Sequence, residues 1–327
     1  MGFWKGKKVL VTGGAGFVGS YLVEYLVEDG AKVTVASNLE RGSKDRLKNV
    51  EKEITFKFTD LKVFDNCKKV CKGQDVVMNL AAKVTGIEYN RTHQSDMFES
   101  NMLLQMLPLK AAVECGVGRF LQVSTACIYP HDAVLPTPES EGARGEPEPT
   151  NSGYGWAKRM GEKLVKFYSE STDMQIAIVR PFNAYGVRDY FDEKTSHVIP
   201  ALIKKVVDGN NPVEVWGSGN QQRVFVHAKD VAMGMKLVTE KYAKADPVNI
   251  GHDKQVTIKE LVKLIQDISG IHNSVLYRTD MPEGYPSRSA DASKLIRVTG
   301  GFVPSTPLEE GVREMIEQYK ISRKNKK

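Results

Sequence analysis

Short runs of β-branched and other apolar residues alternate with longer helical patterns over roughly the first half of the chain. The runs that read as strands are KKVLVTG, AKVTVAS, ITFKFTD, DVVMNLAA, RFLQVSTA and MQIAIVRPF. Strands that alternate with helices favour a parallel sheet whose crossover helices lie on both faces. The predicted fold class is therefore α/β.

The segments between these runs place apolar residues at a spacing of three to four. SYLVEYLVEDG and SDMFESNMLLQMLPLKAAVECG both continue this pattern long enough to predict helices. Pro108 lies inside the second segment, where we expect it to kink or divide the helix.

Beyond about residue 180 the pattern changes to longer loops with Gly and Pro, followed by the helix-like TIKELVKLIQDIS and LEEGVREMIEQYK. We expect a smaller C-terminal substrate-binding lobe that closes over the sheet. Because HAKDVAMGMKLVTEKY and PVNIG read as a return to the first domain, the predicted boundary is interleaved. Residues 1–180 plus about 224–250 form the cofactor domain, and about 181–223 plus 251–327 form the lobe.

The formal net charge of +6 does not indicate a nucleic-acid surface, because it is carried at the two ends of the chain. The residues concerned are Lys5, Lys7, Lys8, Arg323, Lys324, Lys326 and Lys327. MGFWKGKKVLVTGG lacks the apolar core of a secretory signal, and no apolar run is long enough to cross a membrane. We expect a cytoplasmic protein with neither nucleic-acid nor membrane partners.

The four cysteines, Cys67, Cys71, Cys115 and Cys127, show no paired framework. The CKKVC spacing does not match the two-residue gap of zinc or redox pairs, so we expect reduced thiols and no metal site.

A glycine turn follows the first strand in VLVTGGAGFVGSYLVEYL. In a dinucleotide-binding turn one glycine permits the tight bend, one lets the backbone approach a pyrophosphate, and one lets helix and strand pack closely. We expect Gly13, Gly16, Phe17, Val18 and Gly19 to hold the pyrophosphate of NAD or NADP, on a Rossmann-type doubly wound sheet.

The end of the second strand bears on the choice between NAD and NADP. Ser37 stands in VASNLERG where an acid would bind the ribose of NAD, and Arg41 follows it. This favours NADP slightly, although Asn38 could still serve a bare ribose. Asp60, followed by Leu61, is a candidate for the adenine amino group or a turn-forming residue.

Tyr154 and Lys158 lie one helical turn apart in YGWAKRMGEKLVKFY, where the ammonium can lower the pKa of the phenol. STACIYP ends a strand upstream and offers the hydroxyls of Ser124 and Thr125, one of which could hold a sugar oxygen beside the tyrosine.

The glycine turn, NLAAKV, STACIYP, Tyr-x-x-x-Lys and RPFNAYG occur in this order. Together they resemble the extended short-chain dehydrogenase/reductases, the NAD(P)-dependent nucleotide-sugar epimerases, dehydratases and reductases, over essentially the full length. The resemblance implies Tyr154 as acid/base, Lys158 as its partner and nicotinamide-ribose ligand, and Thr125 as a sugar contact. It also implies cofactor contacts from Leu80, Ala81, Ala82, Lys83, Pro181 and Asn183, with Asn183 and lobe residues on the nucleotide.

Within this family the chain looks most like the GDP-L-fucose synthases, which invert carbons 3 and 5 of a 4-keto sugar and reduce the ketone. The matching pieces are AAKVTGI, ACIYP with Cys127, TSHVIPAL with His197 and Val198, and VWGSGNQQRVFVHAKDVA with Trp216 and Arg223. Two other reactions stay open, NAD-dependent 4-epimerisation and GDP-mannose 3,5-epimerisation. VTGGAGFVG looks like the turn of a sugar epimerase, and the GDP-mannose 3,5-epimerases share the STACIYP pattern but not the histidine of TSHVIPAL.

A thiol and an imidazole from two segments suit proton exchange beside a ketone, since inversion needs a base on one face of the sugar and an acid on the other. Cys127 could instead be a buried apolar residue, and His197 a helix cap.

Arg223, Arg288, Lys204 and Lys205 are candidates for the substrate pyrophosphate, with solvated surface charge as the other interpretation. The helical segments 97–115 and 152–171 are expected to form a homodimer through a four-helix bundle. A catalytically silent nucleotide-binding regulator is the alternative to an enzyme.

Overall fold

A computed structural model describes residues 2–192, 196–281 and 284–324 of the chain. Its central sheet consists of β1 (Lys8–Thr12), β2 (Lys32–Ser37), β3 (Ile54–Phe58), β4 (Val76–Asn79), β5 (Arg119–Val123), β6 (Gln175–Pro181) and β11 (Pro247–Ile250). The seven strands are all parallel and lie in the order β3-β2-β1-β4-β5-β6-β11.

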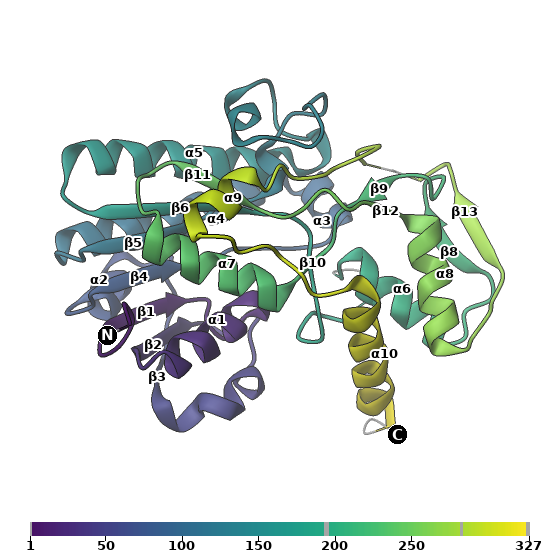
Figure 1. Ribbon diagram of the computed structural model, residues 1–327, viewed down its shortest axis with the longest axis horizontal. Helices are drawn as coiled ribbons and strands as arrows, with labels where there is room; N and C mark the ends of the chain where they lie inside the picture. The colour runs from purple at the N-terminus through teal and green to yellow at the C-terminus, as the bar shows by residue number, and fades with distance from the viewer. Residues whose placement is uncertain (1, 193–195, 282–283, 325–327) are drawn as a thin grey trace.

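Helices cover both faces of this sheet (Figure 1). One layer contains α1 (Phe17–Glu28), α7 (Ala228–Lys241) and α9 (Ser293–Thr299). The opposite layer contains α2 (Phe64–Cys71), α4 (Gln94–Glu114) and α5 (Ser152–Ser171). The predicted Rossmann-type, doubly wound α/β sheet is confirmed.

Successive residues of each strand enter opposite cores, because side chains alternate across a sheet. In β1, Val9 and Val11 pack with the α1 layer, whereas Leu10 packs with the α2 and α4 layer. Burial on both faces explains why central strands such as β1 and β4 are mainly apolar.

A third core lies in the C-terminal lobe, where α6 (Val198–Val207), α8 (Ile258–Ser269) and α10 (Leu308–Lys324) pack together. The lobe also contains the parallel pair β8 (Val213–Trp216) and β13 (Val275–Arg278) and the antiparallel pair β9 (Gln222–Arg223) and β12 (Val256–Thr257). The smaller pair β7 (Ala184–Tyr185) and β10 (Val226–His227) lies beside them.

The proposed domain division assigns residues 251–327 to the lobe. Within that range, however, α9 packs on α7 and β11, and its Leu295 belongs to the core beneath the sheet. The chain therefore returns to the cofactor domain a second time before it enters α10.

Two further observations concern the helices. Pro108 does not divide α4, which continues unbroken from Gln94 to Glu114 and packs on both α2 and α5. Within the described ranges, no helix is both long and apolar enough to cross a membrane.

Candidate active site

The predicted site residues gather at the carboxyl ends of the central strands, where doubly wound sheets bind their ligands. The glycine turn follows β1, Leu80 to Lys83 follow β4, Ser124 and Thr125 follow β5, and Asn183 follows β6. Residues far apart in the sequence therefore meet along one edge of the sheet.

The glycine turn is packed too tightly for side chains. Gly13 has φ of +65°, and a Cβ there would lie 3.1 Å from the Ala81 nitrogen. A Cβ on Gly19 would collide with the Gly13 carbonyl oxygen. Each of these positions therefore requires glycine in this fold.

The N-terminus of α1 fits the pyrophosphate of a dinucleotide. Gly16 is the N-cap and supplies no capping side chain, so the first amides of the helix, including those of Phe17 and Val18, are left to a ligand. Because these amides and the helix dipole both favour an anion, the turn fits NAD or NADP as the sequence predicted.

The ribose end of the site begins at Ser37, which is buried and accepts a hydrogen bond from the Leu39 amide at 3.1 Å. Asn38 accepts a hydrogen bond from the Glu40 amide at 3.1 Å, and its side-chain amide donates to the Glu40 carboxylate at 3.3 Å. Both predicted side chains therefore shape the turn after β2.

Two guanidinium groups meet on the ring of Tyr190. That of Arg41 lies 4.7 Å from the ring centroid, and that of Arg46 lies 4.9 Å from it. Arg46 was not predicted from the sequence, although it stands only five residues after Arg41. The pair places two positive charges in the loop that follows Ser37.

Asp60 acts as a turn-forming residue in this structure, since its carboxylate accepts a hydrogen bond from the Lys62 amide at 2.9 Å. The neighbouring Leu61 is buried in the core with α2. The geometry thus supports the second of the two interpretations of Asp60.

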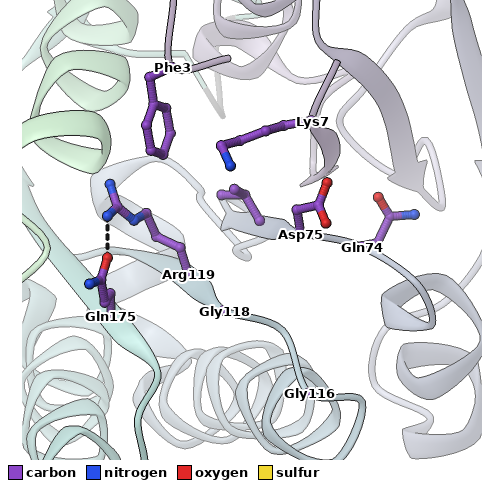
Figure 2. A pocket seen from close by; sticks show the side chains of 9 residues that line it. Phe3, Lys7, Gln74, Asp75, Gly116, Gly118, Arg119 and Gln175 are labelled. Atoms are coloured by element: carbon purple, nitrogen blue, oxygen red, sulfur yellow. Dashed lines mark hydrogen bonds between the residues drawn. The ribbon is translucent and has the colours of Figure 1, made fainter. Parts of the chain in front are cut away.

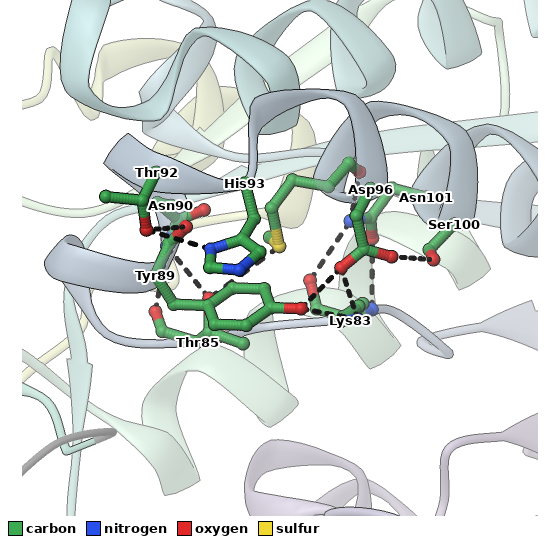
Figure 3. Close-up of polar contacts among 10 residues, drawn as sticks. Lys83, Thr85, Tyr89, Asn90, Thr92, His93, Asp96, Ser100 and Asn101 are labelled. Carbon is green, nitrogen blue, oxygen red and sulfur yellow. Dashed lines mark hydrogen bonds and ion pairs between the residues drawn. The ribbon is translucent and has the colours of Figure 1, made fainter.

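Beyond β4, Lys83 belongs to a network of polar contacts (Figure 3). Its ammonium contacts the Asp96 carboxylate at 2.5 Å and the Tyr89 hydroxyl at 3.3 Å. The hydrogen bond from Lys83 lowers the pKa of Asp96 to about 2. Lys83 therefore ties the loop after β4 to α4, whereas Ala81 donates from its amide to the Thr12 hydroxyl at 3.1 Å.

Tyr154 and Lys158 lie on one side of α5, facing the end of β5. The Lys158 nitrogen lies 5.7 Å from the centroid of the Tyr154 ring and donates to the Val123 carbonyl at 2.8 Å. Thr125, predicted as a sugar contact, hydrogen-bonds with the Tyr154 side chain and so lies beside it. Within the described part of the chain, the hydroxyl of Ser124 is buried without a partner, which suits contact with a ligand.

The expected lowering of the Tyr154 pKa by Lys158 is wrong for this structure. Burial raises the pKa of the Tyr154 phenol, the charge of Cys127 adds to the rise, and the hydrogen bond from Thr125 opposes it. Burial also lowers the pKa of Lys158 to about 8, against the attraction of Glu162. Desolvation is therefore the largest effect on Tyr154 and keeps the phenol protonated, as a proton donor must be.

Cys127 lies in the same cluster as Tyr154. Its sulfur lies 3.9 Å from the Arg288 guanidinium, which in turn contacts the Glu148 carboxylate at 3.5 Å. Arg288 also lies over the Tyr285 ring at 4.0 Å. Arg288 was expected near the substrate pyrophosphate, but in this structure its contacts are with the thiol. Glu148 and Tyr285 were not predicted.

His197 is paired with a different partner. Its Nδ1 lies 2.8 Å from the carboxylate of buried Asp189, at the start of α6 where Val198 is the first helical residue. Although burial opposes protonation, Asp189 raises the pKa of His197, and the nearby Arg41 lowers it. The partner of His197 is therefore Asp189, and that of Cys127 is Arg288.

The remaining substrate candidates come from the lobe and its border. Lys204 pairs with Asp208 at 2.6 Å, and Lys205 donates to the Glu214 carbonyl at 2.7 Å. Arg223 donates to the Tyr285 carbonyl at 2.6 Å. Asn183 donates to the Val224 carbonyl at 2.8 Å, and Trp216 pairs with Arg278 across β8 and β13. Arg223 thereby contacts the segment that carries Arg288.

A hollow of about 420 Å³ lies at the opposite, amino-terminal edge of the sheet (Figure 2). It is lined by Phe3, Lys7, Gln74, Asp75, Val76, Gly116, Gly118, Arg119 and Gln175. It contains none of the predicted site residues.

Comparison with known proteins identifies the family. The model of the NAD dependent epimerase/dehydratase family matches residues 9–251. The chain belongs to this family. It is therefore an NAD(P)-dependent enzyme, which sets aside the alternative of a silent nucleotide-binding regulator.

Within the epimerase/dehydratase family, the chain is 33% identical to probable GDP-L-fucose synthase 1 of Oryza sativa subsp. japonica, over 96% of this chain and 92% of that protein. It is 30% identical to GDP-mannose 3,5-epimerase 1 of the same organism, over 95% of this chain and 82% of that protein. A crystal structure of UDP-glucose 4-epimerase from Thermotoga maritima, with UDP-glucose, superposes with a TM-score of 0.88 and 26% identity, covering 97% of this chain and 99% of that chain.

Proposed function

We propose that this enzyme converts GDP-4-keto-6-deoxymannose into GDP-L-fucose, by inverting carbons 3 and 5 and reducing the ketone at carbon 4. The observation that carries the proposal is the position of Cys127, whose sulfur lies 3.9 Å from the Arg288 guanidinium in the cluster that contains Tyr154. A thiol beside the reducing tyrosine is the additional group that inversion requires. Full-length relatives named GDP-L-fucose synthase support the same substrate.

Inversion requires removal of a proton from a carbon next to the ketone and its return on the other face. Cys127 is the proposed base, since a thiolate is the reactive form of cysteine. His197 is the proposed acid, because Asp189 raises its pKa and thereby favours the protonated imidazole. The two residues come from separate segments, as opposite faces of one sugar ring require.

Reduction requires a hydride at carbon 4 and a proton on its oxygen. The nicotinamide cofactor supplies the hydride when bound. Tyr154 is the proposed proton donor, Thr125 and Ser124 the proposed contacts to the sugar oxygen, and Lys158 the ribose ligand. The raised pKa of Tyr154 keeps the phenol protonated for this step.

NADP is the proposed cofactor. Ser37 leaves room and no negative charge at the ribose, and Arg41 and Arg46 add positive charge to the adjoining loop. A 2′-phosphate is favoured by guanidinium groups and repelled by the carboxylate that usually stands at the end of β2.

The proposed substrate partner is a nucleotide-diphosphate sugar, with Arg223 as the phosphate ligand of the lobe. The proposed location is the cytoplasm, and the proposed assembly is a homodimer formed through α4 and α5. Exposed Phe98 and Met106 on α4 and Phe167 on α5 support that assembly, because apolar side chains gather at such interfaces.

The deciding experiment is to incubate the purified chain with GDP-4-keto-6-deoxymannose, UDP-glucose and GDP-mannose, with NADPH or NAD. Mass spectrometry and NMR identify the products. We expect GDP-L-fucose with consumption of one NADPH for each product. UDP-galactose without net consumption of cofactor would instead indicate a 4-epimerase, the candidate that the glycine turn and the UDP-glucose 4-epimerase structure favour.

A further inference from the structure

The Arg288 guanidinium lies between a thiol and a carboxylate. One of its nitrogens is 3.9 Å from the Cys127 sulfur, and another is 3.5 Å from the Glu148 carboxylate. Arg288 is only 9% exposed and lies on the ring of Tyr285, whose hydroxyl donates to the Tyr129 carbonyl at 2.7 Å. Contacts with neighbouring side chains, rather than with solvent, therefore determine the position of the Arg288 guanidinium.

Both contacts of Arg288 are long. Charge-assisted hydrogen bonds between nitrogen and oxygen usually measure about 2.7–2.9 Å. The Arg288 guanidinium is 3.5 Å from the Glu148 carboxylate and 3.9 Å from the Cys127 sulfur, so it forms a short hydrogen bond with neither group. A small displacement in either direction would strengthen one contact at the expense of the other.

Glu148, in contrast, is held in place. It is 5% exposed, its carboxylate accepts a hydrogen bond from the Asn151 side chain at 2.9 Å, and it accepts another from the Thr150 hydroxyl. These bonds come from the turn that leads into α5, the helix that carries Tyr154. The carboxylate is therefore a fixed point against which Arg288 is positioned.

We propose that Glu148 and Cys127 compete for Arg288, so that Glu148 is a positioning residue that limits how strongly the guanidinium favours the ionised thiol. A cation beside a thiol stabilises the thiolate, and a carboxylate on the other side of that cation draws it away. The role of Cys127 in inversion rests on the proposed function, whereas the competition for Arg288 does not.

Among the described residues, the other charged and titratable groups around the thiol include Tyr154 and, beyond it, Lys158 from α5, Tyr285 from the segment after β13, and Arg223 of β9. His131 stacks on the ring of Tyr285 at 5.1 Å. Arg223 and Glu148 both flank Gly284, where a Cβ would lie 3.3 Å from the Arg223 guanidinium and 3.7 Å from the Glu148 carboxylate. Arg223 therefore remains beside Glu148 in every variant below.

The test measures how fast iodoacetamide alkylates Cys127 in the full chain between about pH 6 and pH 10, with the modified peptide identified by mass spectrometry. In Arg288→Gln the thiol should become reactive only at higher pH, which slows alkylation about tenfold at neutral pH. In Glu148→Gln the released guanidinium should favour the thiolate, so reactivity should appear at lower pH. Opposite shifts are the signature of competition.

Three controls accompany these variants. Glu146→Gln changes an exposed carboxylate of the same loop, which accepts from the Trp156 indole, and should leave the profile unchanged. Arg288→Lys keeps the charge and should restore part of the wild-type profile. Cys67, which is fully buried, should resist alkylation in every folded variant.

Shifts in the same direction in Arg288→Gln and Glu148→Gln, or no shift in either, would overturn the proposal. A variant that fails to fold is recognised by alkylation of Cys67, and Arg288→Met or Glu148→Ala, which also remove the charge, then replaces it. Because this measurement uses no substrate, its result stands even if the nucleotide sugar proves to be a different one. If the proposed function also holds, the pH profile of solvent exchange should shift in Glu148→Gln as the alkylation profile does.

Discussion

The Lys158 ammonium donates a hydrogen bond to the Val123 carbonyl across 2.8 Å and so ties α5 to the end of β5. Lys158 is 2% exposed, and its burial lowers its pKa to about 8 from 10.5. Burial therefore disfavours the charged form of Lys158, which lies next to the phenol of Tyr154.

This relationship predicts how stability depends on pH. Because the pKa of Lys158 is lower in the folded than in the unfolded state, the unfolded chain binds more protons between pH 8 and 10.5. The free energy of unfolding of the wild type should therefore rise relative to Lys158→Met over that interval, by up to about 3 kcal/mol. Urea unfolding of both proteins at several pH values measures this difference. A difference that does not change with pH would contradict the lowered pKa.

The sheet could be predicted because its signal is local. A central strand is buried on both faces, so a run such as KVLVT is buried at every position after the first and ends where the glycine turn begins. The glycine turn could also be predicted from the sequence. The positive φ of Gly13 and the backbone contacts around Gly13 and Gly19 leave no room for a side chain. Pro108 was misjudged because the packing of α4 against α2 and α5 maintains the helix around it.

The partners of the site residues could not be predicted, because they depend on contacts between distant segments. Glu148 and Arg288 are separated by 140 positions, and nothing in either segment indicates that they meet. His197 and Asp189 are close in the sequence, but no pattern there indicates that their side chains pair. Lys83 resembled a cofactor ligand in its motif, but its ammonium contacts Asp96.

Substitution of Gly19 by alanine should abolish tight cofactor binding. The new Cβ would collide with the Gly13 carbonyl oxygen and force the turn away from the N-terminus of α1. We expect the dissociation constant for NADPH to increase at least about tenfold, or about 1.4 kcal/mol. Titration of NADPH fluorescence measures it. Gly118→Ala is the matched control, since its Cβ would find only the Asp75 oxygen at 3.9 Å and should bind as the wild type does.

Substitution of Ser37 by aspartate should shift the cofactor preference from NADP toward NAD. A carboxylate repels the 2′-phosphate and accepts hydrogen bonds from a free ribose hydroxyl. Arg41→Ala should weaken binding of NADP more than binding of NAD. Dissociation constants for both cofactors test this, and a wild type that already prefers NAD would refute the assignment.

The exposed apolar residues of α4 and α5 predict an association that a single charge can disrupt. Phe167 is 53% exposed, so Phe167→Glu removes apolar surface without disturbing the core. We expect light scattering to show a dimer for the wild type at micromolar concentration and a monomer for the variant. Phe58→Glu, at a residue 72% exposed on β3, should remain dimeric as the control. A wild type that is monomeric at this concentration would contradict the proposed homodimer.

The proposed division of labour between Cys127 and Tyr154 predicts two complementary losses. Cys127→Ser keeps the size of the side chain, but a hydroxyl is far less acidic than a thiol, whose ordinary pKa is about 8.5. Inversion at carbons 3 and 5 should therefore collapse, while reduction of a 4-keto sugar that needs no inversion continues. Tyr154→Phe removes the proton donor and should abolish reduction, while deuterium from the solvent still enters the sugar ring.

Deuterium incorporation followed by NMR, together with NADPH consumption, separates the two steps in each variant. Losses of about a hundredfold or more in only one step are expected, as for removal of a positioned acid or base. The two variants control for each other, because a general disturbance of the site would depress both steps together. If Cys127→Ser exchanges protons as fast as the wild type, the thiol only packs beside Arg288. The 4-epimerase then becomes the better assignment, since that reaction oxidises and re-reduces carbon 4 and needs no base at carbons 3 and 5.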